Sequence, residues 1–156
     1  MSDDKIDEMI KISSEKLVLL NKIMELTKEQ NLIIDKSNME RLDSIIDEKD
    51  LLMKRVDELD AKFITYFAEL KRENEVESLD DIDSSIYPNL AKLKELVKEI
   101  TSTIMAISVL DDKNNAILKK ELEKIKHNLR TLKKGQKAYN GYNKKVDHNI
   151  MIDEKK

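Results

Sequence analysis

Apolar residues recur along most of the chain in steps of three and four residues. In the first stretch these positions are Ile6, Ile10, Ser13, Leu17, Leu20, Met24, Thr27, Asn31 and Ile34. The spacing places the side chains on one face of an α-helix and is typical of a coiled-coil seam. Met9, Ile23 and Ile33 widen the apolar face, as expected of a helix that packs against two neighbours. The pattern therefore predicts a first helix over about residues 3–35.

A second helix is predicted over about residues 38–73. Ser37 followed by Glu40 forms a capping box, in which each side chain bonds to the other residue's backbone amide. The apolar face has the same spacing and includes one lysine: Leu42, Ile45, Lys49, Leu52, Val56, Leu59, Phe63, Tyr66 and Leu70. Residues 73–83 contain six acids and no basic residue, so we expect a solvated loop after this helix.

A third helix is predicted over about residues 86–133. Ser85 is its expected N-cap, and Pro88 falls in its first turn, where a missing amide proton costs little. Its stripe reads Leu90, Leu93, Val97, Ile100, Ile104, Ile107, Asp111, Asn114, Leu118, Leu122, Ile125, Leu129 and Leu132. The polar segment DDKNN, residues 111–115, admits a turn and a fourth helix. The stripe continues through it, which favours one long helix.

Short connections make successive helices antiparallel, so we predict an all-α fold, an antiparallel three-helix bundle or coiled coil with a long third helix. The second helix spans about 36 residues, roughly 54 Å at 1.5 Å per residue. A third helix packed along it uses up that length near residue 123. Ile125, Leu129 and Leu132 then have no surface within the chain to cover, and Tyr139 continues their stripe.

An apolar stripe without a partner inside the chain favours one outside it. Three other arrangements would also cover these leucines. The leucines could pack against the start of the first helix, they could pack against a folded-back tail, or they could join two copies of the chain in a dimer.

The composition supports long helices in a single domain. Hydrophobic residues make up 40% of the 156 residues and charged residues 39%, with two glycines and one proline. The absence of cysteine excludes disulfides and thiolate sites. A net charge of −3 argues against nucleic-acid binding. No apolar run approaches the roughly 20 residues of a membrane span, so we expect a soluble, cytoplasmic protein without membrane insertion.

Both glycines and two of the four tyrosines lie in KKGQKAYNGYNKK, residues 133–145. Each glycine lowers helix stability by about 1 kcal/mol relative to alanine. From Lys133 onward, seven lysines stand against three acids. We therefore predict a helical bundle over residues 1–133 and a flexible basic tail over residues 134–156. The alternative is a glycine C-cap at Gly135 followed by an ordinary frayed end.

Motifs for catalysis are missing. The chain has no phosphate-binding G-x-x-x-x-G-K-[ST], no G-x-S-x-G and no H-E-x-x-H. Glu123 and His127 are four residues apart, but a metal site in a helical bundle needs further ligands on facing helices. We therefore predict no catalytic residue, no metal and no cofactor, and we do not expect an enzyme.

Three segments resemble the FlgN family of flagellar type III export chaperones. Residues 36–63, KSNMERLDSIIDEKDLLMKRVDELDAKF, are similar to the family's second helix, with leucines spaced around Lys49 and a Leu59-Asp60 end. LDDKNNAILKKELEKI resembles its asparagine pair, here Asn114 and Asn115, before an apolar stretch. AYNGYNKK is similar to its tyrosine and glycine near the end of the ordered region. The order and spacing of these segments carry the resemblance, which covers nearly the whole chain.

The resemblance implies that the chain binds the C-terminal helices of the hook-filament junction proteins FlgK and FlgL and presents them to the export gate protein FlhA. The client-binding residues are then expected on the third helix: Leu118, Leu122, Ile125, Leu129 and Leu132. The resemblance assigns gate contact to Tyr139, with Tyr142 as the second candidate. The alternative is a structural coiled-coil protein that self-associates, for example as a homodimer, through the third helix.

Overall fold

The computed structural model describes residues 2–36 and 38–150, with side chains described for residues 3–36 and 38–141. The described part contains the helices α1 (Ser2–Ile33), α2 (Met39–Asn74) and α3 (Leu90–Ile150), a short 3-10 helix η1 (Leu79–Asp81), and no strand. The all-α prediction is therefore confirmed. The chain divides into two compact units, Met1–Asn115 and Ala116–Lys156, which are described separately below.

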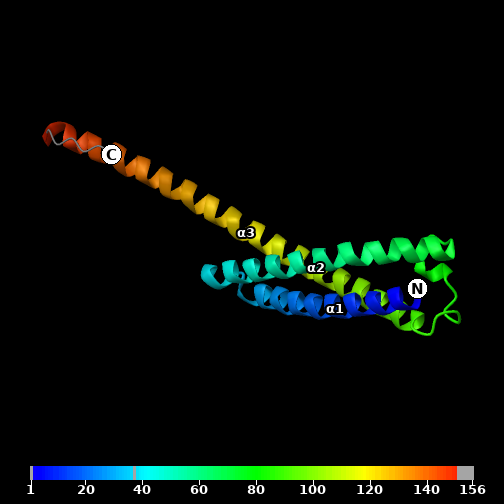
Figure 1. Ribbon diagram of the computed structural model, residues 1–156. Coiled ribbons are helices and arrows are strands. Elements are labelled where there is room, and N and C mark those ends of the chain that lie inside the picture. Colours follow the sequence, from blue (N-terminus) through cyan, green and yellow to red (C-terminus); the bar gives the residue numbers. More distant parts are fainter. Residues whose placement is uncertain (1, 37, 151–156) are drawn as a thin grey trace. The chain divides into compact units, whose positions relative to one another are not determined.

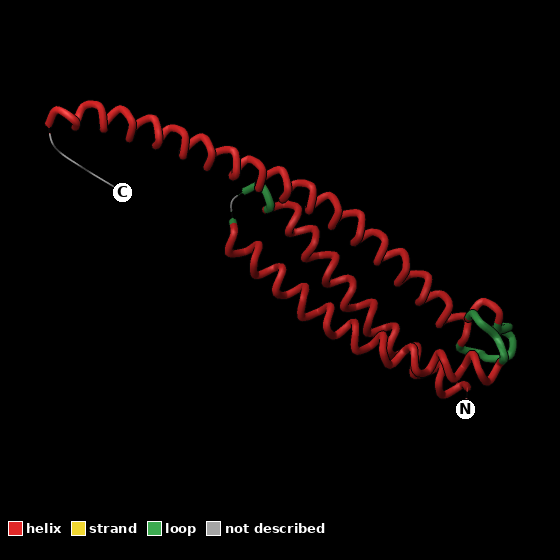
Figure 2. The backbone as a smooth tube through the Cα atoms, turned by 90° about the horizontal axis from the view of Figure 1, so that it is seen from above, coloured by secondary structure: helices red, strands yellow, loops and turns green. Residues whose placement is uncertain are grey.

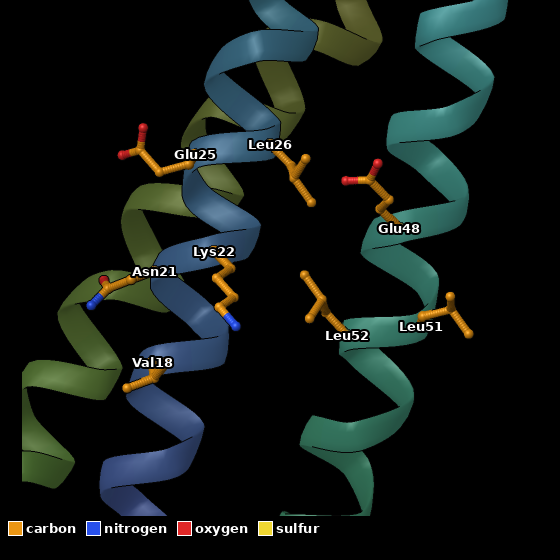
Figure 3. A pocket seen from close by; sticks show the side chains of 8 residues that line it. All are labelled: Val18, Asn21, Lys22, Glu25, Leu26, Glu48, Leu51 and Leu52. Carbon is orange, nitrogen blue, oxygen red and sulfur yellow. The ribbon is translucent and has the colours of Figure 1, made fainter.

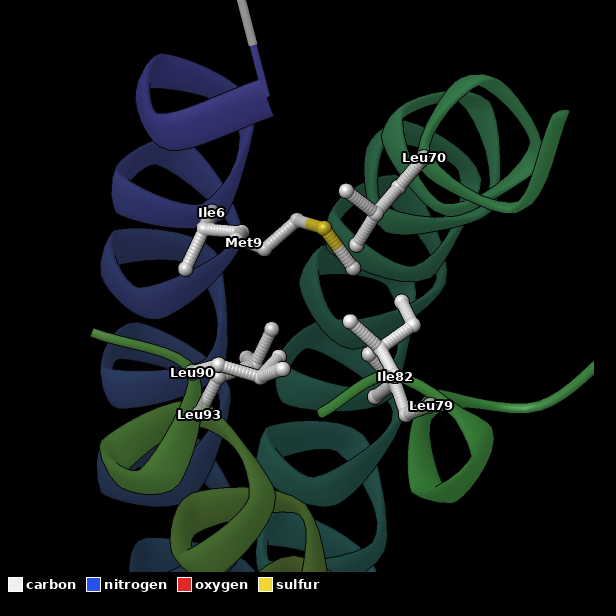
Figure 4. Packing of buried hydrophobic residues seen from close by; sticks show 7 residues of the cluster. All are labelled: Ile6, Met9, Leu70, Leu79, Ile82, Leu90 and Leu93. Carbon is white, nitrogen blue, oxygen red and sulfur yellow. The ribbon is translucent and has the colours of Figure 1, made fainter. Parts of the chain in front are cut away.

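The first unit is an antiparallel three-helix bundle. A short turn joins α1 to α2, and the two helices lie side by side in both views (Figures 1 and 2). One core cluster joins the start of α1, the end of α2, and the start of α3 (Figure 4). Its buried members are Ile6, Met9, Leu70, Leu79, Ile82, Leu90 and Leu93. The helices therefore run up, down and up.

A second core cluster lies further along the same three helices. It consists of Leu20, Ile23, Val56, Ile100 and Ile107. Every seam position predicted for the first two helices is buried or partly buried. Fully burying a leucine or isoleucine side chain contributes about 1.5–3 kcal/mol, so this apolar seam is the main source of the bundle's stability.

The starts of α2 and α3 differ from the sequence prediction. The N-cap of α2 is Asn38, whose Oδ1 accepts a hydrogen bond of 3.2 Å from the Arg41 amide; Ser37, the predicted cap, lies outside the described residues. The third helix begins at Leu90, so the prediction of Ser85 as its cap was wrong. The Ser85 amide instead donates to Asp83 Oδ1 at 3.0 Å in a turn, and Pro88 disfavours a helical conformation for the residue before it.

The connection between α2 and α3 is only partly the solvated loop that its acids predict. Leu79 in η1 and Ile82 after it are buried in the first core cluster. Ser78 caps η1 by accepting a 3.2 Å hydrogen bond from the Asp80 amide. The connection is therefore held to the bundle by two apolar side chains while its carboxylates face the solvent.

A buried amide joins α3 to α1 near the end of the first unit. Asn114 is 0% exposed; its Oδ1 accepts from Asn31 Nδ2 at 2.8 Å, and its Nδ2 donates to the Thr27 carbonyl at 3.1 Å. Asn115, the next residue, is exposed. The two asparagines of the family-like pair thus have different structural roles.

A lysine joins all three helices beside this amide. Lys49 of α2 donates to Gln30 of α1 at 3.1 Å and forms a 2.8 Å ion pair with Asp111 of α3. We call these six residues the polar layer: Thr27, Gln30, Asn31, Lys49, Asp111 and Asn114. Because its members satisfy one another, the seam accepts polar residues here and α3 passes through DDKNN without a break. The prediction of one long third helix is confirmed.

The backbone stays helical through Gly135 and Gly141 as far as Ile150, beyond the predicted end near residue 133. Neither glycine has a positive φ, and a Cβ added at either would meet nothing within 4 Å. One glycine destabilises a helix by about 1 kcal/mol, which is not enough to end a long helix. The predicted flexibility of residues 134–156 remains a prediction.

Replacing Asn114 with alanine removes two buried hydrogen bonds, so we expect the free energy of unfolding to fall by about 1–3 kcal/mol. Urea denaturation measures this change. Asn115→Ala is the matched control and is expected to change stability by less than about 0.5 kcal/mol. Equal effects of the two substitutions would contradict the assigned role of Asn114.

Replacing Gly135 and Gly141 with alanine is expected to stabilise the surrounding helix by about 1 kcal/mol per site, because alanine has the higher helix propensity. Slower amide hydrogen exchange over residues 133–145 reports this gain. Gln136→Ala, which changes propensity much less, is the control. Unchanged exchange in the double glycine variant would show that the glycines do not limit helix stability.

Candidate functional site

The second unit, taken by itself, is the part of α3 from Ala116 onward, with an apolar stripe along one face. We call Leu118, Leu122, Ile125, Leu129 and Leu132 the α3 stripe. Leu118 is partly buried, whereas the other four are 50%, 54%, 53% and 68% exposed. A row of exposed aliphatic side chains at this spacing is typical of one half of a coiled-coil seam.

Helix geometry explains why these residues share a face. Steps of three and four residues bring side chains above one another on the surface of an α-helix, and no proline interrupts α3 after its start. All five members of the stripe were predicted from the spacing of apolar residues. Their side-chain exposure follows from the structure, and their role in binding a partner remains a prediction.

Tyr139 follows Leu132 by seven residues, and its side chain is 64% exposed. Its ring therefore continues the direction of the α3 stripe on the same helix. The backbone of Tyr142 lies in α3, but its side chain lies outside the described side chains. Of the two predicted tyrosines, the structure thus describes only Tyr139 as an accessible aromatic group.

The first unit has an apolar groove between α1 and α2 (Figure 3). Its volume is about 720 Å³. The lining residues are Val18, Asn21, Lys22, Glu25, Leu26, Glu48, Leu51 and Leu52. This groove was not predicted, because Val18, Leu26 and Leu51 fall outside the predicted seams. The signal that could have found it is that these three residues are apolar where the repeat predicts polar ones.

Ion pairs between α1 and α2 flank the groove along both helices. At one end of the groove, Arg55 Nη2 of α2 lies 2.9 Å from Glu15 Oε1 of α1. At the other end, Arg41 of α2 donates to both carboxylate oxygens of Glu29 of α1, at 2.5 and 2.7 Å. These hydrogen bonds lower the pKa of Glu29 and raise the pKa of Arg41. Both groups stay charged at neutral pH, so the pairs hold α1 and α2 together on either side of the groove.

Within the described part of the chain, no group of three or more histidine, cysteine, aspartate or glutamate residues is placed to hold a metal. Glu123 and His127 are both exposed. No described helix has the length and apolar character needed to cross a bilayer.

Comparison with known protein families matches residues 1–149 to the family described as FlgN protein. Searches of curated proteins and of solved structures found no match. The family match includes the bundle, the polar layer, the α3 stripe and Tyr139. Because it covers nearly the whole sequence, the chain belongs to the FlgN family, whose members act as flagellar export chaperones.

Proposed function

We propose that this protein binds the C-terminal amphipathic helices of the hook-filament junction proteins FlgK and FlgL in the cytoplasm and delivers them to the export gate protein FlhA of the type III secretion system. The observation that supports this proposal is the row of exposed side chains Leu122, Ile125, Leu129 and Leu132 on an unbroken helix. Family membership supplies the flagellar context.

A client helix with its own apolar seam would pack knobs into holes against the α3 stripe. Burying an exposed leucine or isoleucine contributes about 1.5–3 kcal/mol, from which the entropy lost on association must be subtracted. The same contact covers the apolar face of the client. Clients bound in this way are kept from associating with one another before export.

Tyr139 is the proposed contact to FlhA, with Tyr142 as the second candidate. A tyrosine ring offers a large apolar area and a hydroxyl that can hydrogen-bond, and such residues often dominate small interfaces. Gly135 lies four residues before Tyr139 and Gly141 two residues after it, which lowers the helix stability of this segment. Tyr139 therefore sits where the helix can adjust when it meets the gate.

The double substitution Ile125→Asp/Leu129→Asp places two charges in the α3 stripe. We expect roughly hundredfold weaker binding of a FlgK or FlgL C-terminal fragment, because two central apolar contacts are lost. Isothermal titration calorimetry measures the affinity, and circular dichroism measures the helicity, which should stay nearly unchanged.

The matched control is His127→Asp/Thr131→Asp, which has the same spacing on the opposite face of the helix. Both control positions are exposed, and we expect client binding to be retained. Melting of the bundle in the stripe variant would show instead that Ile125 and Leu129 belong to the core. Wild-type affinity in that variant would contradict the proposed binding site.

Sedimentation separates the chaperone from a structural protein that self-associates through α3. Client binding through the stripe predicts a complex with one copy of each protein. A homodimer that is independent of concentration and persists after client is added would favour the structural alternative.

Substituting Tyr139 with alanine is expected to leave client affinity unchanged and to reduce export of the junction proteins, because only the gate contact is removed. Secreted FlgK, quantified in culture supernatants, measures the effect. Tyr139→Phe keeps the ring and is expected to retain more export than the alanine variant. Wild-type export by Tyr139→Ala would argue against a role for this residue at the gate.

A further inference from the structure

The α3 stripe is bordered on one side mainly by basic residues; Glu123, seven residues before Arg130, is the one acid on this side. At about 100° of rotation per residue, five basic side chains project from this side of the helix. They are Lys119, Lys126, Arg130, Lys133 and Lys137, and we call them the basic edge. All five are exposed.

The other side of the stripe has a different charge pattern. Glu121 forms an ion pair with Lys124 at 3.4 Å, and Asn128 is the next residue along this side. This opposite edge is therefore close to neutral. The stripe has one charged border and one border without net charge.

The basic edge forms no ion pair within the described part of the protein, and Glu123 is the one carboxylate beside it. None of its five side chains donates a side-chain hydrogen bond or forms an ion pair with a described residue. Arg130 lies four residues from Lys126 and three from Lys133, and like charges at these spacings repel on a helix surface. A partner that carried carboxylates along this border would remove the repulsion.

We infer that the partner of the α3 stripe is an amphipathic helix with carboxylates along one edge of its apolar seam. This inference rests on the proposed function, in which the stripe binds a client helix. In coiled coils, charged residues that flank the seam select the partner and its orientation. The acidic edge of the partner lies against Lys119, Lys126 and Lys133, which recur every seven residues.

A second copy of this chain satisfies the basic edge poorly. In an antiparallel pair the flanking lysines of one copy face those of the other. In a parallel pair they face the opposite edge, where Glu121 is followed at seven-residue spacing by Asn128 and Gly135, so only Glu121 offers a carboxylate. Self-association therefore leaves most of these charges without an opposite charge.

An anionic membrane surface also fits the stripe less well than a helix does. Interfacial helices bury a broad apolar face among lipids. The α3 stripe has two apolar positions per seven residues, the narrow width of a coiled-coil seam. The observations thus favour an acidic helix over a lipid surface.

Two synthetic probe peptides test the inference on the full-length protein. Both have the same apolar seam and the same composition. The acidic-edge peptide carries its glutamates beside the seam and its lysines on the far face. The basic-edge peptide carries its lysines beside the seam and its glutamates on the far face. Fluorescence anisotropy measures their affinities. We expect the acidic-edge peptide to bind roughly tenfold more tightly, and this preference to fall as salt increases.

The variant Lys126→Glu/Lys133→Glu is expected to reverse the preference between the peptides. The control Lys120→Glu/Lys134→Glu changes the net charge equally on the opposite face and is expected to keep the wild-type preference. Circular dichroism checks that both variants remain helical. Equal affinity of the two peptides for the wild-type protein, or no binding of either, would overturn the inference.

Junction-protein fragments and lipid vesicles complete the test. If FlgK and FlgL fragments bind the wild type and the Lys126→Glu/Lys133→Glu variant equally well, the inference fails while the proposed function stands. If the acidic-edge peptide is selected but neither fragment binds, the inference stands and the proposed function fails. Binding to phosphatidylglycerol vesicles that depends on Lys126 and Lys133, without peptide selection, would assign the basic edge to lipid instead.

Discussion

The buried amide of Asn114 imposes the strictest alignment on the bundle. A buried polar group without a partner is costly, whereas an apolar side chain tolerates small shifts along a seam. Sliding α3 by one turn would separate Asn114 from Asn31 and Thr27, and Asp111 from Lys49. The polar layer therefore fixes the register of α3 against α1 and α2. With this register, Ile107 is the last α3 residue in the second core cluster.

The structural core and the proposed binding residues lie in different parts of the chain. The first unit contains both core clusters and the polar layer. Charge is divided in the same way: residues 1–115 contain 17 basic and 27 acidic residues, and residues 116–156 contain 12 basic and 5 acidic residues. The attraction for an acidic partner is thus concentrated in the unit with the exposed stripe, where it would speed encounter.

Most of the fold could be predicted from the periodicity of apolar residues. The seam positions of α1 and α2 are correct throughout, because a strong repeat over many turns outweighs local preferences. The helix ends could not be predicted with the same accuracy. Ser37 and Asn38 are both good N-caps, and the competition between the Asp83 turn and a Ser85 cap involves small energy differences. The burial of Leu79 and Ile82 and the α1–α2 groove depend on contacts between distant parts of the chain.

The proposed binding role of the α3 stripe requires that the stripe lacks a partner until a client binds. Amide hydrogen exchange, followed by mass spectrometry on the free protein and after addition of a FlgK C-terminal fragment, tests this directly. We expect slow exchange over residues 90–115 in both samples, and fast exchange over residues 116–133 that slows only in the complex. Equally slow exchange over both segments in the free monomer would contradict this role.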